Sequence, residues 1–267
     1  METTDRLSEI AVGHDHPAFK LLLSCPSGLS PSEVSAVFDQ TYDRIPHPDV
    51  TLENSISEIW DKRVQKNPSL YNGLKFRYGG HTLSGRADSF RKTDVCLHLG
   101  LTDYRTFVGT NLNPLWERFL IPSEDDWRRC QHTSNPLGNG AIVETSDQEI
   151  VVLQRSTNVG EFPRHFVFPG GHPESKPVFI GISQRVLNVR PTAFFFIKCS
   201  LQSKEIQQLY GSAQDGYEST QLYTMSMVCV QITVDLINWV KKSNSGQLLI
   251  RCLALELLLL EITIFQE

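Results

Sequence analysis

A glycine-rich loop at residues 167–174, with the sequence VFPGGHPE, contains groups that a phosphate-binding loop uses. Its adjacent glycines allow the backbone to approach a phosphate closely, and His172 and Glu174 add side chains able to contact phosphate, sugar or a metal ion. Cleavage of a diphosphate also needs carboxylates that hold divalent cations. Residues 175–204, however, contain no Asp or Glu. The loop therefore predicts phosphate chemistry, while the carboxylates expected behind it are missing.

Motifs on both sides of this loop carry a resemblance to a known family. They are KFR at 75–77, LGLTDYRTF at 99–107, GTN at 109–111, RS at 155–156, PGGHPE at 169–174 and EST at 218–220. Together they resemble the Nudix hydrolases, and among these the UDP-sugar diphosphatases that cleave UDP-glucose and UDP-galactose. The likeness extends over about residues 19–224.

This resemblance implies an α/β/α sandwich around a mixed sheet and a division of the chain into three parts. Residues 1–134 would form an N-terminal extension that helps to enclose the nucleotide, residues 135–224 the Nudix-like domain, and residues 225–267 an atypical hydrophobic tail. The implied reaction is a Mg²⁺-dependent attack of water on the diphosphate, which converts UDP-glucose to UMP and glucose 1-phosphate. In the family box, G-x5-E-x7-R-E-U-x-E-E-x-G-U, the glutamates share one helical face and so share divalent cations.

The chain departs from the family at this helix. Glu174 is followed by only Ser175 and Lys176 before PVFIGI at 177–182, which reads as the strand that should follow the Nudix helix. The helix with its catalytic glutamates is therefore expected to be deleted, as a skipped exon would produce. The unfamiliar tail after Ser226 fits alternative splicing or retained noncoding sequence. Val167 also stands where the family has an acidic residue.

The resemblance implies a set of substrate-binding residues that this chain retains. In this reading aromatic rings contact the uridine, a guanidinium pairs with the diphosphate, and the loop side chains contact phosphate, sugar or metal, with Glu174 the only candidate metal ligand. These residues are Tyr71, Tyr104, Arg155, Gly160, His172 and Glu174. Without the resemblance, the tyrosines read as half-buried core aromatics, Arg155 as a surface ion pair, and the loop residues as solvated.

Composition limits the remaining function classes. A net charge of -5 and a pI near 5.9, with no dense basic run, argue against nucleic acid as a partner. Six scattered cysteines and the lack of a secretory signal suit reduced thiols in the cytoplasm. A membrane span needs about 20 mostly apolar residues. Charged residues interrupt the leucine-rich residues 248–265, so we expect a packed helix or poorly specified hydrophobic sequence there.

The pattern of apolar residues predicts the main elements. We expect a first strand over 19–25 that ends at Pro26, a helix opening at 31–34, and a longer helix capped by Thr51 or Asn54 and stopped by Pro68. Paired strands are expected at 75–78 with 95–99 and at 141–144 with 149–154, and further strands at 166–168, 178–182 and 193–198.

Three smaller questions stay open from the sequence. The cluster His14-Asp15-His16 is expected to be solvated, and residues 124–126, Glu-Asp-Asp, to begin a helix. A weak metal site from Glu174, Glu205, Asp215 and Glu218 is an improbable replacement for the missing helix. The alternative to an enzyme is an inactive variant that binds nucleotide or another protein, or that fails to fold.

Overall fold

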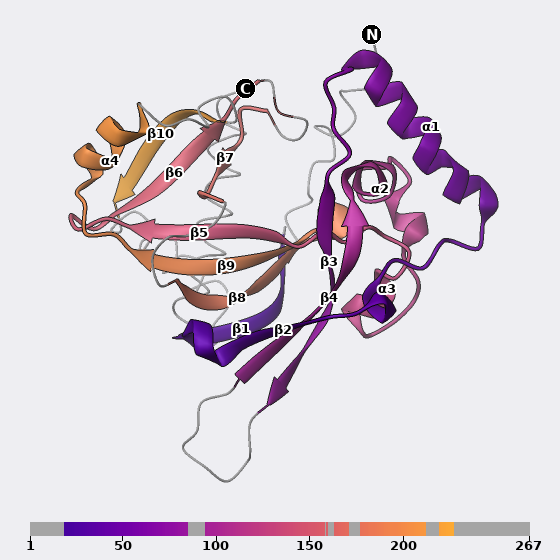
Figure 1. Ribbon diagram of the computed structural model, residues 1–267, viewed down its shortest axis with the longest axis horizontal. Helices are drawn as coiled ribbons and strands as arrows, with labels where there is room; N and C mark the ends of the chain where they lie inside the picture. Colours follow the sequence, from indigo (N-terminus) through magenta and orange to yellow (C-terminus); the bar gives the residue numbers. More distant parts are fainter. Residues whose placement is uncertain are drawn as a thin grey trace, which may run out of the picture.

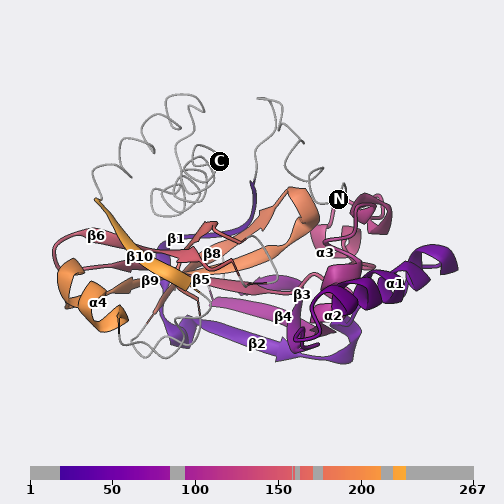
Figure 2. The ribbon, with the colours of Figure 1, turned by 90° about the horizontal axis from the view of Figure 1, so that it is seen from above.

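Two β-sheets form most of the architecture of this computed structural model (Figures 1 and 2). The structure describes residues 19–84, 94–157, 159, 163–170, 177–211 and 219–226. The larger sheet has the strand order β1 (Phe19–Leu29), β8 (Val178–Arg185), β9 (Pro191–Lys198), β5 (Gly138–Glu144), β6 (Glu149–Arg155) and β10 (Ser219–Ser226), and the short β7 (Phe166–Val167) pairs with β6. The smaller sheet has the order β2 (Val34–Phe38), β4 (Asp94–Asp103) and β3 (Leu74–Ser84).

Both sheets are mixed. Strands β5 and β9 are parallel, as are β2 and β4, whereas the other pairs are antiparallel. Strand β1 pairs with β8, so the first described strand belongs to the larger sheet although most of the N-terminal half builds the smaller one. This mixed α/β arrangement confirms the predicted fold class.

Helices gather at opposite ends of the molecule. The helices α1 (Val50–Lys66), α2 (Tyr104–Gly109) and α3 (Asp126–Arg129) lie beside the smaller sheet, and α4 (Ser203–Tyr210) lies beside β10 (Figure 1). Short 3-10 turns are η2 (Pro31–Glu33), η3 (Gln40–Tyr42), η4 (Trp116–Phe119) and η5 (Leu187–Val189). Among the described residues, no helix is long and apolar enough to cross a membrane; the leucine-rich tail lies outside them.

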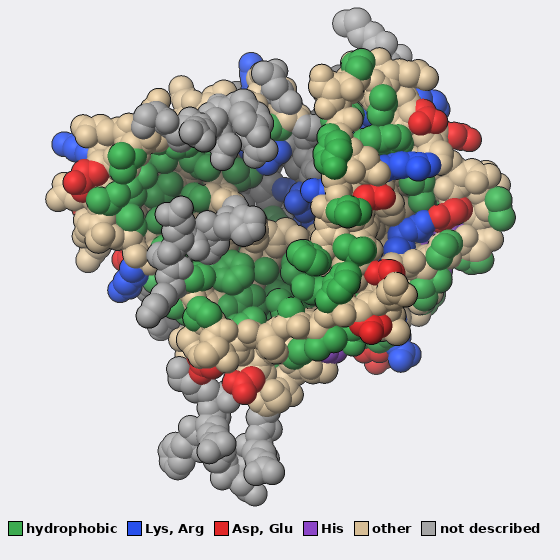
Figure 3. Space-filling model, in the orientation of Figure 1, with side chains coloured by type: hydrophobic (Ala, Val, Ile, Leu, Met, Phe, Trp, Pro, Cys, Tyr) green, Lys and Arg blue, Asp and Glu red, His purple; other side chains and the backbone are tan. Residues whose placement is uncertain are grey.

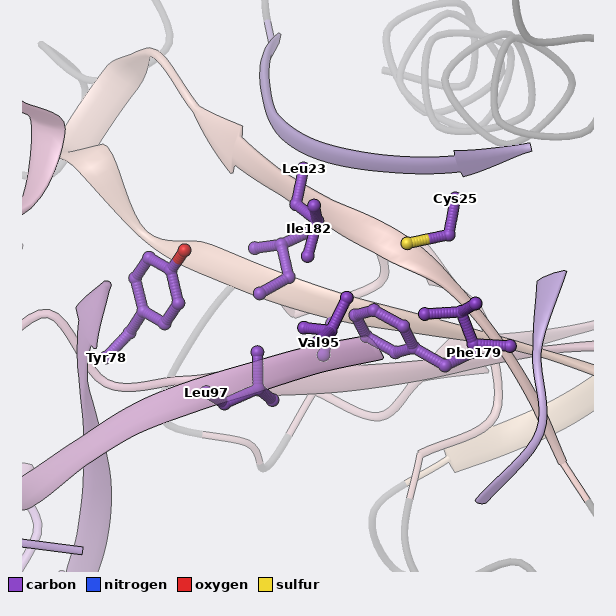
Figure 4. Packing of buried hydrophobic residues seen from close by; sticks show 9 residues of the cluster. Leu23, Cys25, Tyr78, Val95, Leu97, Phe179 and Ile182 are labelled. Carbon is purple, nitrogen blue, oxygen red and sulfur yellow. The ribbon is translucent and has the colours of Figure 1, made fainter. Parts of the chain in front are cut away.

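The main core joins the two sheets. Figure 4 shows Leu23 from β1 and Phe179 from β8 facing Val95 and Leu97 from β4. Val95 is 0% exposed and Phe179 is 1% exposed. Burial of a side chain of this size stabilises a fold by about 1.5–3 kcal/mol. The smaller sheet is therefore held against the β1–β8 side of the larger sheet by apolar packing.

Helix α1 begins earlier than its sequence predicts. The carboxylate of Asp49, rather than Thr51 or Asn54, caps it by accepting hydrogen bonds from the backbone N–H groups of Thr51 and Leu52. The helix ends at Lys66, two residues before Pro68, as expected from the restriction that proline places on the residue before it. The predicted helix is confirmed, and its predicted cap is wrong.

Two N-terminal expectations are also wrong. Strand β1 continues through Pro26 to Leu29 with register shifts, because an edge strand tolerates a residue without an N–H. The predicted helix at 31–34 is only the turn η2, in which Ser30 and Glu33 form a capping box. Strand β2 then starts at Val34, since pairing with β4 outweighs this local helix signal.

A buried arginine ties the smaller sheet to the loops beneath it. Arg77, on β3, is 2% exposed. Its guanidinium donates hydrogen bonds to the backbone carbonyls of Tyr42 at 2.8 Å, Cys130 at 2.9 Å and Thr133 at 3.4 Å. Burial lowers the pKa of Arg77 to about 10. One side chain thus donates to three carbonyls, of which that of Cys130 also accepts from Thr133.

Candidate functional site

The first residues of the glycine-rich loop follow β7 in the chain and lie beside the start of β5. Phe168 is 8% exposed, and its ring meets the ring of Phe194 edge to face at 6.1 Å. The next residue, Pro169, accepts a 2.7 Å hydrogen bond from the N–H of Ala141. A Cβ placed on Gly170 would lie 3.4 Å from Oδ1 of Asn139. The loop is therefore anchored on residues 139–141, at the start of β5 in the middle of the larger sheet.

The chain returns to the sheet soon after this loop. Strand β8 starts at Val178, so only residues 171–177 separate it from Gly170. If the family box starts at Gly170, its last three glutamates fall on Arg185, Asn188 and Val189, within β8 and η5. These positions belong to a strand and a short turn, and none of them carries a carboxylate.

The described residues do not fit a magnesium site. Among them, no three His, Cys, Asp or Glu side chains are close enough to share a metal ion. Of the four acids considered as a replacement site, only Glu205 lies in the described part. Its Oε2 accepts a 2.7 Å hydrogen bond from the N–H of Gln202 and so caps α4. The Glu205 carboxylate thus stabilises the N-terminus of α4.

The two candidate tyrosines lie at one corner, where β3 meets α2. Tyr71 is 83% exposed, whereas the Tyr104 ring is half-buried against Trp60, with 6.0 Å between ring centroids. Nζ of Lys75 lies 5.6 Å from the centroid of the same ring. The backbone N–H of Tyr104 donates to the carbonyl of Gly73, two residues after Tyr71. The structure therefore brings these tyrosines into the same corner, with only Tyr71 largely exposed.

Arg155 lies on the other sheet, at the end of β6. Its backbone N–H donates to the carbonyl of His165, and its carbonyl accepts from Arg164, so it begins the turn that returns to β7. Val167, on β7, pairs with Leu153. Arg155 is thus on the strand that supports the glycine loop. The other three candidates, Gly160, His172 and Glu174, lie outside the described residues, so their roles stay predictions.

A second arginine, which the sequence did not single out, lies near the loop's support. A Cβ placed on Gly138 would be 3.5 Å from a terminal nitrogen of Arg190. The guanidinium carbon of Arg190 is 5.2 Å from the centroid of the buried Phe107 ring. Figure 3 shows a hollow between the larger sheet and the helix-bearing side, with Lys and Arg side chains at its edge. No spacing or motif marks Arg190, because the fold alone brings it to β5.

Sequence reasoning also missed an exposed aromatic pair on the smaller sheet. Phe38 is 53% exposed and Phe76 is 57% exposed, and their ring centroids are 6.1 Å apart. The carbonyl of Phe76 accepts a 2.9 Å hydrogen bond from Leu137, directly before β5. In the sequence both residues belong to apolar strands, which predicts burial; only the sheet packing shows that they are uncovered.

Two smaller polar clusters, residues 124–126 and residues 14–16, were considered from the sequence. Residues 124–126 include Asp125, which is the N-cap of α3, so the expected helix start is confirmed. The cluster His14-Asp15-His16 lies outside the described residues. Neither cluster adds a group to the site.

Comparison with known proteins places the chain in a family. No family model matches it. It is 53% identical over 258 aligned residues to a protein named Nudix hydrolase 9 from Arabidopsis thaliana, an alignment that covers 78% of this chain and 83% of the relative. Proteins named uridine diphosphate glucose pyrophosphatase NUDT22 are 29% identical in Homo sapiens, covering 86% and 90%, and 31% identical in Bos taurus, covering 76% and 85%.

The alignment with the plant protein contains a gap in this chain. It extends over 258 residues, yet 78% of the 267 residues here is only about 208. About 50 aligned positions of the relative therefore have no counterpart in this chain. Identity over most of both sequences nonetheless establishes common descent, and the chain belongs to the Nudix hydrolase family.

Proposed function

We propose that this chain binds UDP-sugars such as UDP-glucose and UDP-galactose, and that its hydrolysis of them to UMP and sugar 1-phosphate is impaired. Relatives named for UDP-glucose pyrophosphatase activity support the substrate class. The glycine loop on β5, with Arg190 near its support, suits a diphosphate, because backbone N–H groups and guanidinium groups both bind phosphate oxygens.

The impaired hydrolysis is inferred mainly from the short connection between Gly170 and β8. The family box needs a helix between the glycine loop and the following strand, whereas seven residues, 171–177, connect Gly170 to β8 here. The aligned positions that lack a counterpart support the same reading. Nudix hydrolases generally use a divalent metal such as Mg²⁺. Because the described residues do not fit a magnesium site, the proposal assigns this chain substrate binding without a metal-assisted step.

Each remaining residue has a role in binding rather than in bond cleavage. Arg155 pairs with the diphosphate, and Gly160, His172 and Glu174 complete the loop around phosphate or sugar, with Glu174 the one candidate metal ligand. Tyr71 and Tyr104 contact the uridine, by stacking on it or by hydrogen-bonding it and its ribose. Residues 1–134 act as the extension that closes the site over the Nudix-like residues 135–224. These roles, and a cytoplasmic location without nucleic-acid partners, are parts of the proposal.

The first experiment measures Mg²⁺-dependent release of UMP from UDP-glucose by the purified chain. Cooperative urea unfolding, followed by tryptophan fluorescence, first establishes that the chain is folded. UDP-glucose binding measured by calorimetry with little or no UMP release is the expected result. Rapid release that a chelator abolishes would refute the impairment. A folded chain without UDP-glucose binding would refute the function itself.

A chimaera tests the cause of the impairment. The segment that Nudix hydrolase 9 has and this chain lacks is inserted after Glu174, with a Gly-Ser segment of equal length as the matched control. The proposal expects UMP release from the chimaera alone. If the chimaera folds and binds UDP-glucose but releases no UMP, the missing segment is not the cause.

We further propose that the gap arose by exon skipping. The transcript is sequenced against its genomic locus. A coding exon with the missing segment between the codons for Glu174 and Pro177, or close to them, supports a splice variant, whereas a continuous exon across this point excludes it.

The alternative function is that of an inactive variant acting as an interaction protein. The exposed Phe38 and Phe76 side chains favour it, since exposed apolar patches mark binding surfaces. Sedimentation without nucleotide distinguishes it: an interaction protein shows association that UDP-glucose does not alter.

A further inference from the structure

One face of the smaller sheet is apolar beyond the point where the larger sheet covers it. Phe38 pairs with Leu99, and Phe76 pairs with Leu101, two positions further along β4, so all four side chains share a face. At the covered end of β4, Val95 and Leu97 lie in the core and are 0% and 8% exposed. At the other end, Phe38, Phe76, Leu101 and Leu74 are 53%, 57%, 42% and 77% exposed.

We name these four uncovered residues, Phe38, Leu74, Phe76 and Leu101, the apolar shelf. The two rings on it come from β2 and β3, the strands on either side of β4. Their planes cross at 78° with a centroid distance of 6.1 Å, so they converge above the middle strand. An aromatic pair in this position offers ring faces and edges but no hydrogen-bonding group.

The shelf lies next to the glycine loop. Leu137 donates its N–H to the carbonyl of Phe76 and is followed directly by β5, whose Asn139 contacts Gly170. At the rise of an extended strand, Leu137 and Asn139 are about 7 Å apart along the chain. The backbone between the contact with Phe76 and the contact with Gly170 thus spans about the length of one nucleoside.

Charge is arranged to match a nucleotide in this orientation. The guanidinium of Arg190 lies beside Gly138, and so close to the stretch of backbone that joins the shelf to Gly170, although Gly138 and Asn139 point to opposite faces of the strand. The acidic residue beside the shelf is Asp103, which pairs with Leu74, and its carboxylate accepts a hydrogen bond from the N–H of Thr106 and so caps α2. An anionic group is favoured at the loop end, and an uncharged planar group at the shelf end.

We propose that the apolar shelf is the nucleobase platform, on which the uracil of the UDP-sugar stacks while its diphosphate extends towards Gly170 and Asn139. The assignment rests on the proposed function for the identity of the nucleotide. It gives the base to Phe38 and Phe76, which leaves Tyr71 and Tyr104, at the β3–α2 corner, to the ribose side. Every base has a π-face, so the shelf binds the base without reading its edge.

The experiment measures saturation transfer from the full-length protein to the uracil protons of uridine, and calorimetric binding of UDP. The variants are Phe76→Leu and Phe38→Leu, which keep an apolar side chain but remove the ring. The matched control is Leu83→Ala, since Leu83 is 56% exposed on the same strand and pairs with Val95 at the far end. Each ring variant is expected to weaken UDP binding about tenfold, with pyrophosphate binding and the control unchanged.

The readouts separate this inference from the proposed function. If the wild-type chain shows transfer to uridine that Phe76→Leu abolishes, the platform holds even where UDP-glucose is never hydrolysed. If the wild-type chain binds UDP but both ring variants bind it equally well, the platform is refuted and the function stands. The inference is overturned if uridine receives no saturation transfer, or if the only effect of the ring variants is to dissociate a dimer. In either case the shelf binds something other than a base.

Discussion

The backbone N–H of Leu137 donates a 2.9 Å hydrogen bond to the carbonyl oxygen of Phe76. Next to this bond, Arg77 forms a β-bridge with Pro136, and the N–H of Tyr78 donates to the carbonyl of Asn135. The segment before β5 thus lies along β3 of the smaller sheet before it enters the larger sheet. A single stretch of backbone fixes the position of the glycine loop relative to the apolar shelf.

Arg155 provides a test of ligand binding. Its replacement by Met is expected to weaken UDP binding about tenfold or more, because a hydrogen bond to a charged group contributes about 1.5–3 kcal/mol. Calorimetry with UDP measures the loss. The matched control is Arg128→Met on α3, an exposed arginine 3.5 Å from Asp125, which should bind UDP like the wild type. Equal affinities of Arg155→Met and the wild type for UDP would show that Arg155 does not bind the diphosphate.

Arg77 provides a test of stability. Its replacement by Met is expected to lower the free energy of unfolding by about 2–6 kcal/mol, because the carbonyls of Tyr42 and Thr133 would lose this donor and each such loss costs about 1–3 kcal/mol. Urea denaturation followed by fluorescence measures the change. Arg118→Met is the control, since Arg118 forms an exposed 3.0 Å pair with Asp49 and such pairs contribute about 0–1 kcal/mol. Similar losses in both variants would show that the buried carbonyls find other donors.

Local sequence patterns predicted much of this fold because their signals are short-range. The helical spacing of Ile56 and Trp60 identifies α1, and paired apolar or alternating segments identify the antiparallel pairs β3–β4 and β5–β6, all of which the structure confirms. The pairing of β1 with β8 joins residues more than a hundred positions apart. No local pattern encodes such a contact, and the same is true of Arg190 beside Gly138.

The sequence pointed to the loop of the candidate site but not to the aromatic residues near it. Adjacent glycines next to a short strand predict a phosphate loop; the structure confirms the short strand β7, and the phosphate-binding role of the loop stays a prediction. Phe38 and Phe76, in contrast, stand in strands that mix buried and exposed apolar residues: on β3, Tyr78 is buried whereas Leu74 is exposed. Whether such a ring faces the core or an open surface depends on how far the larger sheet extends over it, which is a property of tertiary packing.

Gly109 provides a test of helix packing. A Cβ on this residue would lie 2.6 Å from the Cα of Ile56, so Gly109→Ala would force α2 away from α1. Overpacking of this kind typically costs about 1–3 kcal/mol, and urea denaturation measures it. Gly211→Ala is the control, because its nearest neighbour would be a carbonyl oxygen at 3.5 Å. A Gly109→Ala protein as stable as the control would show that the two helices separate without cost.

Asp147 makes stability depend on acid pH through one identifiable contact. Hydrogen bonds from Ser203 and Thr145 lower the pKa of Asp147 from 3.8 to about 2. The ionised carboxylate therefore favours the folded state above pH 3.8, and this contribution is lost as the pH falls from 3.8 towards 2. Asp147→Asn should remove that part of the pH dependence.

The effect acts between two elements, which makes it measurable. Oδ1 of Asp147 accepts from the N–H of Ser203 at 2.9 Å, and Oδ2 accepts from its hydroxyl at 2.6 Å, so the β5–β6 turn is joined to the start of α4. Urea denaturation at pH 5 and at pH 2.5 should show a smaller drop in stability for Asp147→Asn than for the wild type. Ser203→Ala, which removes only the hydroxyl donor, should lie between them. Identical drops in all three proteins would mean that α4 is held by its packing on β10 alone.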